Sequence, residues 1–120
     1  MWLAYHFINR APGISYVGSL PGYYIMARSR WGPATGRGLA AKKAGCECNV
    51  LPEMDSIYHW KGEIRHGKEH KMFIKTSATR IAALQREIRA AHPYAVAEIL
   101  HFKIDSGDPD YLDWITQSTQ

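Results

Sequence analysis

Two strand-like segments joined by a two-residue turn restrict the possible folds of this chain more than any other feature. The first segment runs from Asn49 to Trp60, and the second runs from Glu63 to Thr76 and ends in an apolar run. Lys61-Gly62 between them is typical of a tight hairpin turn. At about 3.3 Å per residue, each arm would reach roughly 35–45 Å, which exceeds what a small domain needs for its own sheet. Because an overhanging hairpin leaves unpaired backbone groups, it predicts an oligomer built by strand pairing between subunits.

The clearest helix signal follows the hairpin. Apolar residues between Ser77 and Ala91 recur on one helical face, and Ser77 can cap the N-terminus of that helix. His92-Pro93 should end it, because a residue before proline is pushed out of the α region. The stripe that we expect to pack is formed by Ile81, Leu84, Ile88 and Ala91.

Shorter elements complete the pattern. Pro52 indicates a bulge or an edge position early in the first hairpin arm. Asp108 and Pro109 can start a short terminal helix as its N-cap and first residue. The remaining predicted elements are a strand over 23–27, a short helix over 39–44 and a strand over 95–104. The resulting order is the β-α-β-β-α-β pattern of a ferredoxin-like α+β domain, with a long β-hairpin and a short C-terminal helix.

Composition excludes several classes of protein. The chain has 120 residues, 46% hydrophobic and 22% charged, which suits one globular domain with a modest core. No apolar run approaches the ~18 residues that span a bilayer, so we expect no membrane association. The first ten residues lack the basic region and cleavage site of a secretory signal. Cys46 and Cys48 are poorly spaced for a mutual disulfide, which favours a reducing, cytoplasmic location.

The net charge of +4 comes from the N-terminal part of the chain. Only Glu47 is acidic in the first 50 residues, against the basic residues Arg10, Arg28, Arg30, Arg37, Lys42 and Lys43. These lie among glycines and prolines, with no regular element to present them, so we expect no nucleic-acid partner. We interpret residues 1–20 as a loose extension and residues 21–120 as the folded domain.

Several motifs in the second half resemble the CutA family of divalent-cation tolerance proteins, over about residues 49–116. The matching motifs, in order, are Asn49-Val50-Leu51-Pro52, the hairpin Ser56-Ile57-Tyr58-His59-Trp60-Lys61-Gly62, Glu69, Ile74-Lys75-Thr76, His92-Pro93-Tyr94 with Glu98-Ile99, and Gly107-Asp108 with Tyr111-Leu112 and Trp114. Each motif is short, and their common order and spacing carry the resemblance.

This resemblance implies a compact homotrimer of ferredoxin-like subunits, similar to the PII signalling proteins and assembled by inter-subunit strand pairing. It also implies tolerance of copper and other divalent metals, with metal binding by a histidine and cysteines. No enzymatic activity is implied. The residues themselves agree, since no paired carboxylates, nucleophile–base pair or phosphate-binding glycine loop stands out.

Residues 21–48 are atypical for the family. The Pro-Asp/Asn-Glu motif of the first strand is missing, and Ala44-Gly45-Cys46-Glu47-Cys48 stands where Leu-Ala-Ala-Cys-Val is expected. A one-nucleotide displacement of the codons for Ala-Gly-Cys-Glu allows Leu-Ala-Ala-Ser. We hypothesise that the region before Cys48 is partly translated out of frame or comes from a misassembled gene model. A transcript that confirms this reading frame would contradict the hypothesis.

The candidate metal ligands are His92, Cys48 and Cys46. Imidazole and thiolate both suit copper and zinc. The alternatives are a structural histidine at a helix end, where the backbone dipole favours a cation or a polar contact, and a partly buried thiol pair in a strand. Tyr94, Glu98 and Trp60 are expected to serve structure or an interface. A second possible function is a PII-like signalling or scaffold trimer whose clefts bind a small molecule or a partner protein.

Overall fold

The computed structural model describes residues 22–29, 37–38 and 45–120. The predicted extension over 1–20 and the predicted helix over 39–44 lie outside these residues. The described strands are β1 (Gly22–Ser29), β2 (Glu47–Val50), β3 (Met54–Trp60), β4 (Glu63–Ser77) and β5 (Glu98–Lys103). The described helices are α2 (Ile81–Ala91) and α3 (Pro109–Ser118).

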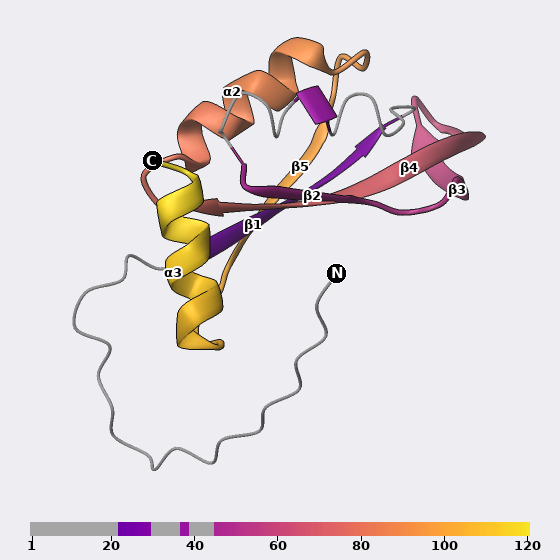
Figure 1. Ribbon diagram of the computed structural model, residues 1–120. Coiled ribbons are helices and arrows are strands. Elements are labelled where there is room, and N and C mark those ends of the chain that lie inside the picture. Colours follow the sequence, from indigo (N-terminus) through magenta and orange to yellow (C-terminus); the bar gives the residue numbers. More distant parts are fainter. Residues whose placement is uncertain (1–21, 30–36, 39–44) are drawn as a thin grey trace.

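The strands form one antiparallel arrangement in the order β2-β4-β1-β5, and β3 pairs with the far part of β4. Strand β1 lies between β4 and β5, although both follow it by many residues in the sequence (Figure 1). Since β2 and β3 together make the first hairpin arm, this order is that of the ferredoxin-like α+β fold. The predicted fold class is therefore confirmed.

Helix α2 covers one face of the sheet and builds the core. Its spacing places Leu84 and Ile88 on the sheet side, where both are fully buried. They pack with residues that alternate along β1 and β4, as expected when one face of a strand is buried. The buried strand residues of this cluster are Ile25, Ala27, Met72 and Ile74.

The opposite face of the sheet carries a second apolar group, which we call the open face: Tyr24, Met26, Phe73, Leu100 and Phe102. Strand pairing aligns these five side chains across β4, β1 and β5. Tyr24 stacks on Phe102 with ring centroids 4.7 Å apart, and Leu100 is 46% exposed. Of the described elements, only α3 packs here, at the end where β1 begins. There Ile115 is buried, and Thr119 donates a hydrogen bond to Ser77 (2.8 Å).

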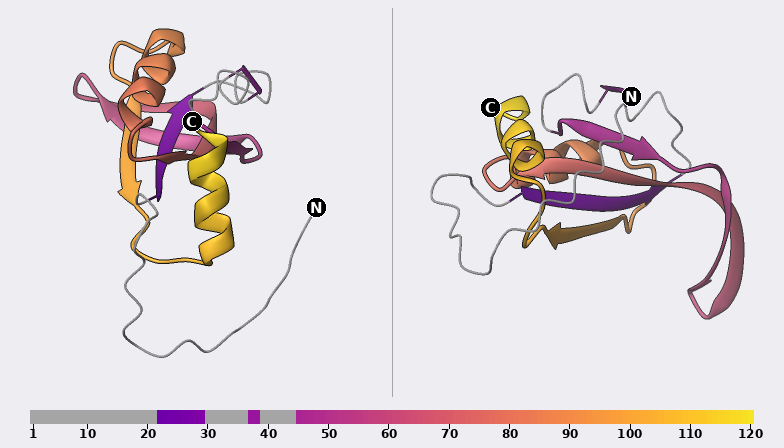
Figure 2. Two further views of the ribbon diagram at one scale, coloured as in Figure 1. Left: turned by 60° about the vertical axis from the view of Figure 1, so that its left-hand side comes forward. Right: turned by 60° about the horizontal axis from the view of Figure 1, so that its bottom comes forward.

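The hairpin extends beyond the sheet as predicted. Lys61 and Gly62 both have positive φ, 51° and 80°, as a tight two-residue turn of this type requires. Strand β1 pairs with β4 only from His70 to Ser77, so the segment from Glu63 to Glu69 pairs with β3 alone. Figure 2 shows this two-stranded ribbon curving away from the rest of the sheet. Both edges of the ribbon are therefore unpaired among the described strands.

A bulge divides the first arm at Pro52, and this arm pairs only with β4 at the edge of the described sheet, so both positions predicted for this proline are confirmed. Val50 pairs with Met72 and Met54 pairs with Glu69. Three residues, 51–53, thus face two residues, His70 and Lys71, on the partner strand. The Leu51 N–H still donates to the Lys71 carbonyl (2.9 Å), so the two arms stay joined across the bulge.

The prediction that Ser77 caps α2 is wrong. Ser77 is the last residue of β4, where it pairs with Gly22, and the helix begins only at Ile81 with no side-chain cap. Residues 78–80 form a turn between the two elements. The strand extends further than predicted because its partner β1 is available up to Gly22. Ala91, expected to pack, is exposed at the end of the helix.

The terminal helix begins as predicted. Asp108 accepts a hydrogen bond from the Tyr111 N–H (3.1 Å), and Pro109 occupies the first helical position. Ile115 is the buried residue of α3, whereas Tyr111 and Trp114 are each 42% exposed. Within the described residues, neither helix has the length and apolar character that crossing a membrane would require.

Candidate functional site

His92 ends α2, as expected for the residue before Pro93. Its backbone has turned to an extended conformation (ψ 127°), and its Nδ1 accepts a hydrogen bond from the Tyr94 N–H (3.1 Å). The ring also lies 5.1 Å from the Tyr94 ring. In a neutral imidazole whose Nδ1 accepts, Nε2 carries the proton. A metal ion at Nε2 would therefore require that proton to move and the contact with Tyr94 to break.

The two cysteines lie at the other edge of the sheet, at the start of β2. The Cys46 thiol contacts the carbonyl of Lys75 (3.5 Å), and the Cys48 thiol contacts the thioether sulfur of Met72 (3.8 Å). Both cysteines are half-buried and free of disulfides. Burial raises the pKa of each thiol to about 11, so both are protonated near neutral pH.

The structure does not bring His92 together with the cysteines within one subunit. His92 precedes β5, whereas Cys48 lies in β2 and Cys46 directly before it, and two strands lie between these edges. Three strand spacings amount to about 14 Å. Ligands of one metal ion lie within about 5 Å of each other, given bonds of about 2.0–2.3 Å. Over the described ranges, no group of three His, Cys, Asp or Glu side chains is arranged to hold a metal ion.

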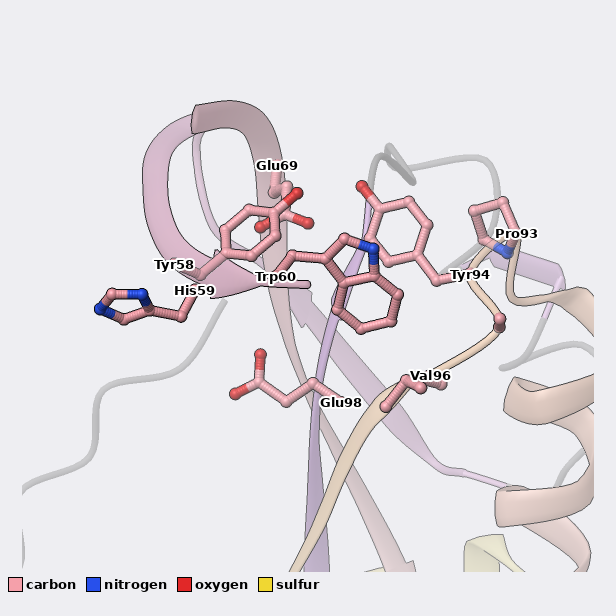
Figure 3. A pocket seen from close by; sticks show the side chains of 10 residues that line it. Tyr58, His59, Trp60, Glu69, Pro93, Tyr94, Val96 and Glu98 are labelled. Carbon is pink, nitrogen blue, oxygen red and sulfur yellow. The ribbon is translucent and has the colours of Figure 1, made fainter. Parts of the chain in front are cut away.

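A pocket of about 490 Å³ opens where the hairpin curves over the start of β5. The pocket lies on the same side of the sheet as the open face. On β4, Glu69 points to the same side as Phe73, and on β5, Glu98 points to the same side as Leu100. Figure 3 shows Trp60 above the carboxylate of Glu98, and His59 pointing away from the centre. Its lining comprises Tyr58, His59, Trp60, Glu69, Pro93, Tyr94, Ala95, Val96, Ala97 and Glu98.

Charged side chains lie beneath this aromatic lining. Glu69 is only 1% exposed. Glu98 forms an ion pair with Lys71, with Nζ 3.2 Å from Oε1. Such a cavity, with aromatic walls and a few polar groups, is typical of small-molecule sites. Strand β5 begins only at Glu98, three residues later than predicted, because residues 94–96 form a bend beside the pocket.

Sequence reasoning did not predict this pocket. Trp60, Tyr94 and Glu98 were expected to serve structure or an interface, and each was interpreted separately. The signal that could have found the pocket is their common membership in the motifs around Trp60 and His92-Pro93-Tyr94. These motifs come together only because the hairpin bends over the segment after α2.

A second polar network joins α3 to the edge of the sheet. The Tyr111 hydroxyl donates to Glu47 Oε2 (2.7 Å), and Lys75 lies 3.2 Å from the same oxygen. Partial burial of Glu47 opposes its ionisation, but the hydrogen bonds from Tyr111 and Asn49 and the charge of Lys75 outweigh it, so the pKa of Glu47 is lowered. Burial and the nearby carboxylate raise the pKa of Tyr111. These groups fix α3 against β2.

Comparison with known proteins covers most of the chain. The family model described as "CutA1 divalent ion tolerance protein" matches residues 25–118. The "Protein CutA homolog" of Xenopus laevis is 39% identical over 79 residues, which are 66% of this chain and 52% of that protein. The "Divalent-cation tolerance protein CutA" of Thermus thermophilus is 32% identical over 69% of this chain and 81% of its own length. The chain spans about half the length of the vertebrate relatives it matches.

The fold has solved counterparts. The "PII-like protein CutA from Nostoc sp. PCC 7120 in apo form" superposes with a TM-score of 0.77, covering 82% of this chain and 97% of that one at 24% identity. At this identity the likeness concerns the fold alone. It agrees with the PII-like, ferredoxin-like architecture expected from the sequence.

Proposed function

This chain belongs to the CutA1 divalent ion tolerance family, and from that premise we propose that it acts as a cytoplasmic homotrimer that binds copper or other divalent metal ions. The role of this protein would be in tolerance of these ions or in the response to them. The proposal includes no catalysed reaction. The observation that carries the proposal is the open face, together with the unpaired edges of the hairpin.

The open face supports assembly because it combines exposure with apolar character. Leu100 and the aromatic side chains beside it form one continuous patch over three strands. The ribbon of β3 and β4 offers backbone groups to a strand of another subunit. It also exposes Ile57 and Ile64, at 72% and 70%. A symmetric trimer would cover both features at once, which is how closed homo-oligomers bury such surfaces.

Sedimentation of the purified full chain tests the assembly. We expect a stable trimer at micromolar concentration, because burial of an aromatic face and pairing of strand edges reinforce each other. A protein that sediments as a monomer at that concentration would contradict the proposal.

The metal ligands that we propose remain His92, Cys48 and Cys46. Since His92 and the cysteines lie at opposite edges of one sheet, a site that uses both must form across a subunit boundary. Divalent-ion binding should then depend on assembly. The raised thiol pKa values also mean that binding must displace protons from the cysteines.

Calorimetric titration with Cu²⁺ tests these ligands. We expect His92→Ala and the double variant Cys46→Ser/Cys48→Ser each to weaken binding at least about tenfold, the usual scale for loss of one coordinating or supporting group. His59→Ala provides a matched control, because this histidine points away from the pocket and is exposed. Unchanged affinity in both test variants would remove the proposed site.

The pocket favours a second candidate function. Its volume and its aromatic and carboxylate lining suit a small organic molecule, as in the alternative of a PII-like signalling trimer. The same titration separates the two candidates. A trimer that binds no divalent ion would favour the signalling function. Divalent-ion binding that is lost in the His92→Ala variant would favour the function in ion tolerance.

A further inference from the structure

The pocket beneath the curved hairpin has aromatic walls from two distant segments of the chain. Tyr58 and Trp60 come from β3, and Tyr94 comes from the bend after α2. Figure 3 shows their rings around one space, with the carboxylates of Glu69 and Glu98 beside them. The volume of about 490 Å³ lies within the range of small-molecule sites, about 300–1,000 Å³.

We propose that this pocket binds a small organic ammonium ion, held by the rings of Tyr58, Trp60 and Tyr94 and by the carboxylate of Glu98. The inference rests on the second candidate function, which assigns a small organic molecule to the pocket, and it adds the charge and the chemical class of that molecule. The site lies apart from the cysteines proposed as metal ligands, which belong to the opposite edge of the sheet.

The aromatic walls favour a cation. The face of an aromatic ring is the negative part of its quadrupole, and it attracts an ammonium group within about 6 Å of the ring centre. Trp gives the strongest contact of this kind, and several rings together are the usual way in which proteins recognise alkylated ammonium groups. A divalent ion such as Mg²⁺ gives up its water reluctantly and therefore gains little from the same rings.

The carboxylates supply acceptors for the N–H groups of such a ligand. Glu98 accepts from Lys71, with Nζ 3.2 Å from Oε1. Because a carboxylate has about four acceptor positions, Glu98 can hold Lys71 and a ligand ammonium at the same time. Glu69 is 1% exposed at the base of the hairpin and belongs to the same lining. Hydrogen bonds between ammonium and carboxylate are about twice as strong as those between neutral groups.

Basic residues also occupy this region of the sheet. Lys71 forms its ion pair with Glu98, and strand register places Arg28 of β1 opposite both of them. Since Glu69 and Glu98 are matched in number by Lys71 and Arg28, the count of charges alone selects neither a cation nor an anion. The rings make the difference, because they attract a cation and repel an anion. The inference therefore predicts selectivity by charge among ligands of similar size.

Calorimetric titration of the purified full chain with benzylamine, benzyl alcohol and benzoate tests this selectivity. The three molecules share one ring, and benzylamine is the cation of the series near neutral pH. We expect benzylamine to bind at least about tenfold more tightly than the other two, which is the scale of one hydrogen bond to a charged group. Equal binding of benzyl alcohol, or tighter binding of benzoate, would overturn the inference.

Variants of the lining assign the binding to the rings and the carboxylate. Trp60→Leu should weaken benzylamine binding about tenfold, whereas Trp60→Phe should keep most of the affinity because it restores an aromatic face. Trp60 is 39% exposed, so neither change should disturb the fold. Glu98→Gln should weaken binding at least about tenfold, since the amide carries no charge. Unchanged affinity in both Trp60→Leu and Glu98→Gln would overturn the inference.

A control variant separates the pocket from the overall charge of the chain. Asp113→Asn removes one negative charge at an exposed position of α3, outside the lining, and should leave benzylamine binding unchanged. A loss equal to that of Glu98→Gln would overturn the inference, because it would assign the effect to net charge. Sedimentation and circular dichroism of each variant establish that its assembly and fold match those of the original chain.

The outcomes also separate this inference from the functions proposed above. Tightest binding of benzyl alcohol or benzoate would keep the small-molecule function and reject the ammonium ion, whereas binding of none of the three would reject both. The double variant Cys46→Ser/Cys48→Ser should bind benzylamine normally while its Cu²⁺ binding is weakened. Loss of benzylamine binding in that variant would overturn the inference. Benzylamine binding by a chain that binds no Cu²⁺ would reject the divalent-ion proposal alone.

Discussion

Replacing Leu100 by Asp should convert the trimer into folded monomers. Leu100 lies on β5, the outer strand of the open face, and is 46% exposed in the isolated subunit, so the carboxylate is solvated when the chain is alone. In the trimer, the same group would be buried against apolar side chains without a partner. An uncompensated buried charge costs about 4 kcal/mol. At 1.4 kcal/mol per tenfold change, the dissociation constant should rise roughly 1,000-fold.

Sedimentation and circular dichroism together measure this effect. The control is Ala82→Asp, which adds the same charge at an exposed position of α2 on the other side of the sheet. It should leave the assembly intact. A Leu100→Asp variant that still sediments as the original protein would show that the open face is not the subunit interface. A variant that loses its secondary structure altogether would show that the subunit cannot fold alone.

Truncation of Leu84 should produce a large loss of stability. Leu84 is fully buried between α2 and the sheet, in the cluster with Ile25, Ile74 and Ile88. Leu84→Ala removes apolar contacts and leaves a cavity that rigid neighbouring strands cannot close. We expect the free energy of unfolding to fall by about 3 kcal/mol, within the range of 2–5 kcal/mol for such changes.

Denaturant unfolding at fixed protein concentration measures this loss. Gln85→Ala, at the next and exposed position of the same helix, is the control and should change stability by less than about 0.5 kcal/mol. Equal stabilities of the two variants would mean that α2 does not pack on the sheet as described.

Much of the fold could be predicted because its signals are local. The turn at Lys61-Gly62 needs positive φ, and glycine supplies one of the two positions without strain. The bulge at Pro52 follows from the missing N–H of proline, and the end of α2 at His92 follows from the proline after it. Each of these features depends on residues within a few positions of one another.

Features that depend on distant residues could not be predicted. Whether Ser77 caps a helix or ends a strand depends on its pairing with Gly22, far earlier in the chain. The pocket needs the curvature of the hairpin, which brings Trp60 over Glu98. The contact between Cys48 and Met72 needs the register of β2 on β4. The separation of His92 from the cysteines likewise follows from strand order rather than from spacing in the sequence.

The one extra residue between β2 and β3 determines which face of the sheet each side chain of β2 occupies. Side chains on a strand alternate between two faces, so an added residue reverses the alternation beyond it. In β2, odd-numbered residues such as Asn49 lie on the same face of the sheet as Phe73. In β3, beyond the bulge, the even-numbered residues Tyr58 and Trp60 lie on that face. The turn at Lys61-Gly62 fixes the pairing of Trp60 with Glu63, so the register without the bulge would instead place Cys48 opposite Lys75, on the side of the open face. The bulge at Pro52 thus decides on which side of the sheet the Cys48 thiol lies.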